Sequence, residues 1–127
     1  MKFRPSLLAL GALAAMTLAP AAIAHPRLVS ATPAANAAVA PTTTIKLDFS
    51  ERLTPKLSSA TLVMTGMPGM KDHPPMKMPA TSQVAADGKS IVLTSARPLV
   101  RGSYRVDWVV IGADTHRITG THAFTVK

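Results

Sequence analysis

The chain has 127 residues, of which 47% are hydrophobic, 16% charged and 4% aromatic, with no cysteine and a formal net charge of +8. This length fits one small domain, and the lack of cysteine excludes disulfide frameworks, thiolate zinc sites, cysteine nucleophiles and C-x-x-C redox chemistry. Any metal ion would have to be held by histidine, methionine, carboxylate or backbone groups.

The first 24 residues differ in composition from the rest. They open with two basic residues, continue through an apolar stretch from 7 to 18, and end in Ala22-Ile23-Ala24, the n-region, h-region and A-x-A pattern of a secretory signal. The competing interpretation is a membrane anchor, but about a dozen apolar residues fall short of the roughly 20 that span a bilayer. We expect cleavage after Ala24 and an exported chain that starts at His25.

The charge of the exported chain follows from this cleavage. Without Lys2 and Arg4, twelve basic residues face six acidic ones, a net charge of +6. The basic residues are scattered along the sequence, and an exported chain does not meet the genome, so we expect no nucleic-acid partner. We favour a solvated basic surface over an acidic partner or a membrane surface.

The expected amino terminus is a candidate metal chelate. Cleavage gives His25 a free α-amino group beside its imidazole, and both nitrogens can bind one metal ion in a single ring. Copper(II) favours such nitrogen-rich tetragonal sets. Pro26 has no amide N–H for Cu(II) to displace, so coordination cannot continue along the backbone. Further ligands must come from elsewhere in the fold.

The exported chain is typical of an all-β protein, because short alternating stretches are separated by Pro, Gly, Asn and Asp, without a convincing 3.6-residue repeat. In the stretch 102–111, Tyr104, Val106, Trp108 and Val110 share one face, and we expect Trp108 to anchor the core. Gly88 supplies a hairpin turn. The expected strands are 27–31, 43–50, 58–64, 81–86, 90–94, 102–111 and 119–126. Seven short strands predict a two-sheet sandwich.

All five methionines after residue 24 fall within MTGMPGMKDHPPMKM, residues 64–78, which also contains His73. Five Gly and Pro residues there, with Pro79 directly after, exclude a helix interior and disfavour a regular strand, so we expect an irregular, partly exposed loop. Exposed methionine is prone to oxidation, and thioether sulfur suits Cu(I) without needing deprotonation. We favour a Cu(I) site over core packing, with a methionine-rich surface for a partner protein as the remaining alternative.

Asp114-Thr115-His116 is the candidate supplier of further Cu(II) ligands. Residues two apart on an extended segment point the same way and would offer a carboxylate and an imidazole together. The alternative is a surface Asp that caps a turn beside an exposed His. His122 shares the alternation of its apolar neighbours, and we interpret it as a histidine at the edge of the core.

Together these segments resemble the CopC family, small periplasmic copper-binding proteins of bacterial copper-resistance systems. The resemblance covers residues 25–127, and its opening segment, methionine loop and D-T-H segment occur together and in order. The matching segments are HPRLVSATPA at the expected amino terminus, LDFSE (47–51), VMTGMPGM (63–70), YRVDW (104–108), DTHRITG (114–120) and the closing FTVK.

The resemblance implies a seven-stranded Greek-key β-sandwich, immunoglobulin-like and cupredoxin-like, with two copper sites at opposite ends. Cu(II) would be held by the amine and imidazole of His25, by His116, and by Asp114 as ligand or close support. Cu(I) would be held by a subset of four methionines with His73 as a further candidate; these methionines are Met64, Met67, Met70 and Met76. Lys71, Asp72 and Met78 depart from the family pattern, so the choice of sulfurs stays open.

We therefore expect a soluble periplasmic copper carrier or buffer without turnover or small-molecule substrate. It would pass copper to a copper-transporting inner-membrane protein or a periplasmic copper protein. One rival is a copper oxygenase with an amino-terminal histidine brace, but 103 residues after the signal and few aromatics argue against a polysaccharide-binding face. The other rival, an immunoglobulin-like adhesion or chaperone module, leaves the methionine loop unexplained.

Overall fold

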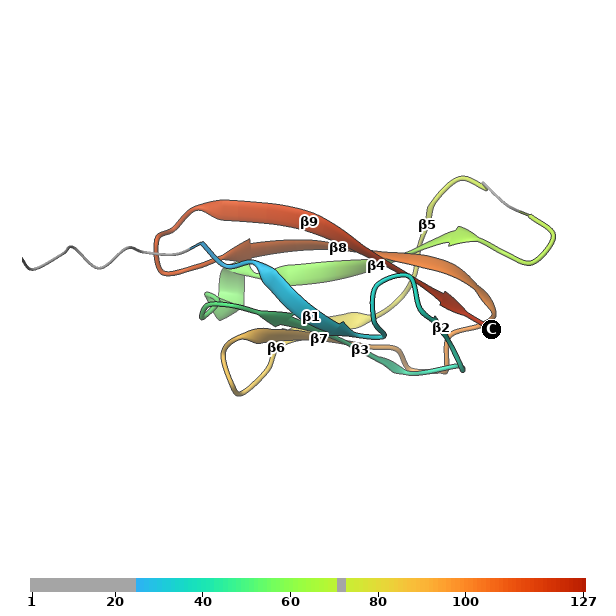
Figure 1. Ribbon diagram of the computed structural model, residues 1–127, viewed down its shortest axis with the longest axis horizontal. Coiled ribbons are helices and arrows are strands. Elements are labelled where there is room, and N and C mark those ends of the chain that lie inside the picture. The colour runs from blue at the N-terminus through green and yellow to red at the C-terminus, as the bar shows by residue number, and fades with distance from the viewer. Residues whose placement is uncertain (1–24, 71–72) are drawn as a thin grey trace, which may run out of the picture.

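The computed structural model describes residues 25–70 and 73–127; the expected signal segment, Lys71 and Asp72 lie outside the described residues. Two β-sheets pack face to face (Figure 1). No helix in the described ranges is long and apolar enough to cross a membrane. The fold class predicted from the alternation, an all-β sandwich, is confirmed.

The first sheet has four antiparallel strands in the order β1-β3-β7-β6. Their bounds are β1 (Leu28–Thr32), β3 (Thr44–Phe49), β7 (Ser90–Thr94) and β6 (Thr81–Val84). The turn between β6 and β7 contains Gly88 at a φ of 73°, the conformation that this hairpin requires. The register places Asp48 of β3 opposite Ser90 of β7.

The second sheet has five strands in the order β2-β9-β8-β4-β5. They are β2 (Ala38–Val39), β9 (Arg117–Val126), β8 (Gly102–Ile111), β4 (Ser59–Gly66) and β5 (Met76–Lys77), with a 3-10 turn η1 (Pro55–Leu57) before β4. β2 runs parallel to β9 and the other neighbours are antiparallel. The long β8–β9 hairpin runs from one end of the molecule to the other (Figure 1).

The core lies between the two sheets. Trp108 of β8 packs its edge against the Phe49 ring of β3, with ring centroids 5.0 Å apart, and Tyr104 stacks on Phe124 at 5.5 Å. All four rings are buried, as the alternation in β3, β8 and β9 predicts. The interpretation of His122 is also confirmed, because it is buried and its Nε2 lies 2.8 Å from the Pro33 carbonyl oxygen.

All seven expected strands are present, but the described residues contain nine. The two additional strands, β2 and β5, have two residues each, too short for an alternation pattern. The expectation of an irregular methionine loop is therefore wrong in two places. β4 continues to Gly66, two residues beyond the expected strand end at Met64, and Met76 of β5 pairs directly with Met64. Hydrogen bonds to β4 hold the backbone around β5 in place despite the flanking prolines. One of them runs from the Met78 N–H to the Leu62 carbonyl at 2.9 Å.

Candidate metal centres

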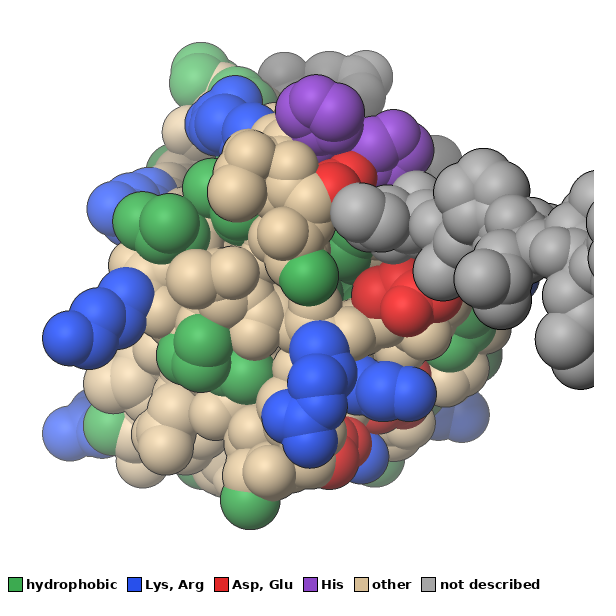
Figure 2. Space-filling model, turned by 90° about the vertical axis from the view of Figure 1, so that its left-hand side faces the viewer, with side chains coloured by type: hydrophobic (Ala, Val, Ile, Leu, Met, Phe, Trp, Pro, Cys, Tyr) green, Lys and Arg blue, Asp and Glu red, His purple; other side chains and the backbone are tan. Residues whose placement is uncertain are grey.

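The first candidate centre combines the segment before β1 with the connection between β8 and β9. These two segments meet at one end of the sandwich, opposite the β4–β5 connection (Figure 1). At this end two histidine side chains lie side by side next to an acidic side chain (Figure 2). They are the predicted residues His25, His116 and Asp114, whose ligand atoms all lie within 4.8 Å of one another.

The Asp114 carboxylate is the centre of this group. Its side chain is only 8% exposed, whereas both imidazoles are open to solvent. Its Oδ2 forms an ion-pair contact with the Nδ1 of His25 and lies 3.3 Å from the Nδ1 of His116. Apart from these two imidazoles, this buried oxygen has no partner among the described residues. Two ring nitrogens thus adjoin one carboxylate oxygen, which is the donor set of a cation site.

The electrostatics of Asp114 favour the charged carboxylate. Burial raises the pKa of this carboxyl, but the backbone N–H of His116 and the charges of both imidazoles lower it, and the net pKa lies below the ordinary value. The N–H of His116 donates to Oδ1 at 3.3 Å. One carboxylate oxygen is therefore held by the backbone and the other is left for the imidazoles or a metal ion.

A tight turn, and not the expected extended segment, brings Asp114 and His116 together. The Thr115 N–H donates to the Gly112 carbonyl at 3.1 Å, and Thr115 has a φ of 66°. A β-branched residue rarely adopts this left-handed conformation. The alternation argument was thus wrong about the backbone, because a turn ahead of β9 replaces the two-residue repeat, although the two side chains do lie close together.

Sequence analysis missed the part that Gly112 plays in positioning His25. Pro26 is fully buried, and a Cβ built on Gly112 would lie 2.8 Å from its Cγ and 3.5 Å from Oδ1 of Asp114. The next residue is also fixed, since the Ser50 N–H donates to the Arg27 carbonyl at 2.9 Å. The packing of Pro26 on Gly112 therefore fixes the position of His25 beside Asp114. In the sequence, the only indication of this contact is the glycine two residues before the D-T-H segment.

The second candidate centre lies at the opposite end, in the connection between β4 and β5 (Figure 1). Met67 and Met70 form an isolated antiparallel pair whose N–H groups donate to each other's carbonyls at 3.1 and 3.0 Å. Pro68 and Gly69, the latter at a φ of 78°, form the turn between them. Directly paired residues project their side chains to the same side. The M-P-G-M sequence thus presents two thioethers together, 36% and 54% exposed.

The remaining predicted sulfur and nitrogen donors have different surroundings. Met76 is 50% exposed, whereas its strand partner Met64 is 2% exposed and belongs to the core. The Nδ1 of His73 lies 2.8 Å from the Pro74 carbonyl oxygen, and its Nε2 has no hydrogen-bond partner among the described residues. A proton on Nδ1 that donates to this carbonyl leaves the Nε2 lone pair free, the usual state of a metal-binding histidine.

The family model described as CopC domain matches residues 28–127. The chain belongs to the CopC family. It is 51% identical over 112 residues to "Copper resistance protein C" of Escherichia coli, covering 88% of this chain and 89% of the relative. It is 47% identical to the protein of the same name from Xanthomonas campestris pv. juglandis, covering 90% and 89% of the two chains.

Solved structures agree with this family assignment. The crystal structure of PcoC, described as a methionine-rich copper resistance protein from Escherichia coli, matches with a TM-score of 0.75 at 50% identity. The match covers 82% of this chain and all of PcoC. The CopC resemblance of the sequence and the sandwich fold that it implies are confirmed.

Proposed function

We propose that this chain is a periplasmic copper-binding protein that carries or buffers copper and passes it to other copper proteins without catalytic turnover. The main observation behind this proposal is the buried Oδ2 of Asp114, whose only neighbouring partners among the described residues are two imidazole nitrogens. The names of the CopC relatives, which are copper resistance proteins, support copper as the metal.

In this proposal Cu(II) binds at the His25 end. The donors are the His25 imidazole, the His116 imidazole, Asp114 as ligand or close support, and the α-amine that cleavage after Ala24 would free. The His25 nitrogen facing Asp114 is Nδ1, the ring nitrogen that can close a six-membered chelate with its own amine. Nitrogen donors with one carboxylate form the set that Cu(II) prefers.

Cu(I) binds at the other end in this proposal, to Met67, Met70 and Met76 with His73 as the nitrogen donor. The support is the paired geometry of the M-P-G-M turn, the exposure of the three thioethers and the free Nε2 of His73. Met64 is assigned a packing role, because moving its buried side chain to the surface would open a cavity in the core.

Export by the segment 1–24 would place the protein in the periplasm, and its partners would be a copper-transporting inner-membrane protein or a periplasmic copper protein. The oxygenase alternative requires a face that binds polysaccharide. All four aromatic rings of the described residues outside the histidines are buried, so such a face has no stacking platform there. We expect no oxidised sugar products when the copper-loaded protein is given peroxide and cellulose or chitin.

The test is a titration of protein starting at His25 with Cu(II), and separately with Cu(I) against a competing chelator. His116→Ala should weaken Cu(II) binding and spare Cu(I), whereas the double variant Met67→Leu/Met70→Leu should do the reverse. Met64→Leu is the matched control and should leave the Cu(I) affinity unchanged. X-ray absorption of the Cu(I) form should show sulfur neighbours. Equal effects of each variant on both oxidation states would contradict the two-site proposal.

A further inference from the structure

The end of the molecule with the Met67–Met70 turn gathers exposed apolar side chains. Of the six large apolar side chains that are exposed in the described residues, four lie here: Met67, Met70, Met76 and Val100. The three thioethers are candidate copper donors, but Val100 has no ligand atom. Isolated exposed apolar residues need no explanation, whereas a group of them indicates an interaction surface.

Two grooves lie near this end of the molecule, and the second of them is lined by residues of the methionine turn. The first, of about 330 Å³, has predominantly apolar walls formed by Met78, Pro79, Pro98, Leu99 and Val100. The second, of about 260 Å³, runs from Met67 and the turn to the ends of β8 and β9. Val100 lines the first groove and its neighbour Arg101 lines the second, so the two grooves adjoin along the chain.

Positive charge borders both grooves. Arg97 lines the first, and Arg101 and Lys127 line the second. No acidic side chain among the described residues lines either groove, and none forms an ion pair with these three cations. The described acids lie elsewhere, in β3, after β3, before β7, in β8 and in the first metal centre. The basic residues that are scattered along the sequence are thus partly gathered here by the fold.

We propose that these two grooves are the docking site for an acidic, extended segment of a partner protein whose apolar side chains fill the first groove. The first groove is a hollow whose lining includes Pro79 and Pro98, and side chains of an extended segment can enter such a hollow, whereas the flat surface of a bilayer cannot. The described surface also lacks the exposed aromatic residues that anchor proteins at membranes. A second copy of this chain would present the same positive charges and be repelled.

Such docking would place the partner next to Met67, which lines the second groove and belongs to the candidate Cu(I) centre. The link to copper transfer rests on the proposed function, but the docking itself needs no metal. It can therefore be tested on metal-free protein, so that failure of docking and failure of copper binding give separate results.

The probe is a blocked ten-residue peptide in which Glu alternates with Leu, and its control carries Lys in place of Glu. NMR titration of metal-free protein should shift amide signals within 67–70, 95–103 and 125–127. The double variant Arg97→Glu/Arg101→Glu should weaken binding at least about tenfold, as should raising the salt concentration to about 0.5 M. Lys56→Glu, an exposed charge reversal in η1, is the matched control and should change little.

Three outcomes would overturn the proposal: shifts centred outside these segments or absent, equal binding of the Lys peptide, or equal binding by the double variant. Tighter binding to phosphatidylglycerol vesicles through the same residues would assign the surface to lipid instead. Dimerisation through these grooves would assign it to a second copy. Copper titration of the double variant should match the unmodified chain, which separates lost docking from a damaged metal centre.

Discussion

The contact between Pro26 and Gly112 decides where His25 can lie. The rigid Pro26 ring is fully buried against the glycine, so there is no space into which it could shift. The two residues are far apart in the sequence and meet only because β1 and the β8–β9 connection reach the same end of the sandwich. Sequence analysis could name candidate ligands from their chemistry, but it could not find a contact that depends on the packing of two sheets.

Gly112→Ala should therefore displace Pro26 and weaken Cu(II) binding at least about tenfold (~1.4 kcal/mol). The added Cβ would lie 2.8 and 2.9 Å from two ring atoms of Pro26, closer than real contacts allow. Competition with a Cu(II) chelator measures the change. Gly66→Ala is the matched control, because its Cβ would meet Ser103 at an ordinary 3.6 Å. Unchanged Cu(II) affinity in Gly112→Ala would show that Pro26 does not position the chelate.

The amine of His25 gives a second prediction about a single residue. Protein with one extra residue before His25 should lose Cu(II) affinity by at least about tenfold, because the added peptide bond removes the basic amine. Its Cu(I) affinity should not change, since the methionine turn lies at the other end. Both affinities are measured by chelator competition. Equal Cu(II) affinity with and without the extension would remove the amine from the ligand set.

Among the elements, long alternating strands were predictable and short paired segments were not. β7 and β8 have the predicted bounds: β8 alternates between buried and more exposed residues along its whole length, and β7 is a short apolar run that follows a turn. β9 begins at Arg117, two residues earlier than expected, since pairing with Ile111 extends the ladder. The M-P-G-M turn contains the right residues for a tight turn, but its flanking methionines pair only through the backbone, which a hydrophobic pattern does not report.

The first sheet also contains a shared hydroxyl that the sequence did not reveal. The Ser90 Oγ of β7 lies 2.7 Å from Oδ1 of Asp48 and 2.8 Å from Oδ2 of Asp87, although it has one proton to donate. The Ser90 bond lowers the pKa of Asp48; burial opposes it, while Ser30 and Lys46 lower the pKa further. The folded pKa is thus below the unfolded one, so the carboxylate stabilises the fold above about pH 4.

Ser90→Ala should lower the free energy of unfolding at pH 7 by about 1 kcal/mol, because a buried hydrogen bond to a carboxylate is lost. The stability that Asp48 contributes disappears as the pH falls through its folded pKa, so the difference between the two proteins should shrink below about pH 4. Urea unfolding at several pH values measures this. Ser30→Ala, which removes the lesser hydroxyl contact to Asp48, should have a smaller effect. A difference independent of pH would assign the loss to packing alone.

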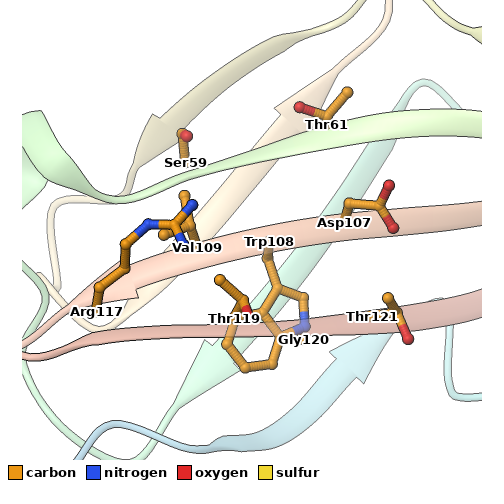
Figure 3. Close-up of a pocket in the computed structure, with 9 residues that line it drawn as sticks. All are labelled: Ser59, Thr61, Asp107, Trp108, Val109, Arg117, Thr119, Gly120 and Thr121. Carbon is orange, nitrogen blue, oxygen red and sulfur yellow. The ribbon is translucent and has the colours of Figure 1, made fainter.

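On the scale of the whole molecule, the two candidate centres lie at opposite ends of the sandwich (Figure 1). Among the described residues, the one group of three His, Asp or Glu side chains close enough to hold a metal ion is His25, Asp114 and His116. The outer face of the five-stranded sheet has a shallow groove. That groove is lined by Ser59, Thr61, Asp107, Thr119 and Thr121, with Arg117 at its edge (Figure 3). In the two-site proposal, copper that changes its preferred ligands on reduction would therefore have to leave one end before it reaches the other.

We expect ascorbate, added to protein carrying one Cu(II), to replace a nitrogen-coordinated signal with a sulfur-coordinated one in X-ray absorption, because Cu(I) prefers thioethers. Transfer between molecules should make the rate rise with protein concentration. Mixing Cu(II)-loaded Met67→Leu/Met70→Leu protein with copper-free His116→Ala protein should still give transfer. A reduced ion that stays on nitrogen while the methionines are free would contradict the prediction.

The length of the β8–β9 hairpin sets the distance between the two ends of the molecule. Ten residue pairs join its strands from Gly102–Val126 to Ile111–Arg117. At roughly 3.3 Å per residue, this ladder spans about 30 Å. That length exceeds the radius of a typical small domain, so a protein docked on the methionine turn, as proposed, would leave the histidine end uncovered. In that case one molecule would have room to contact a copper donor at one end and a copper recipient at the other.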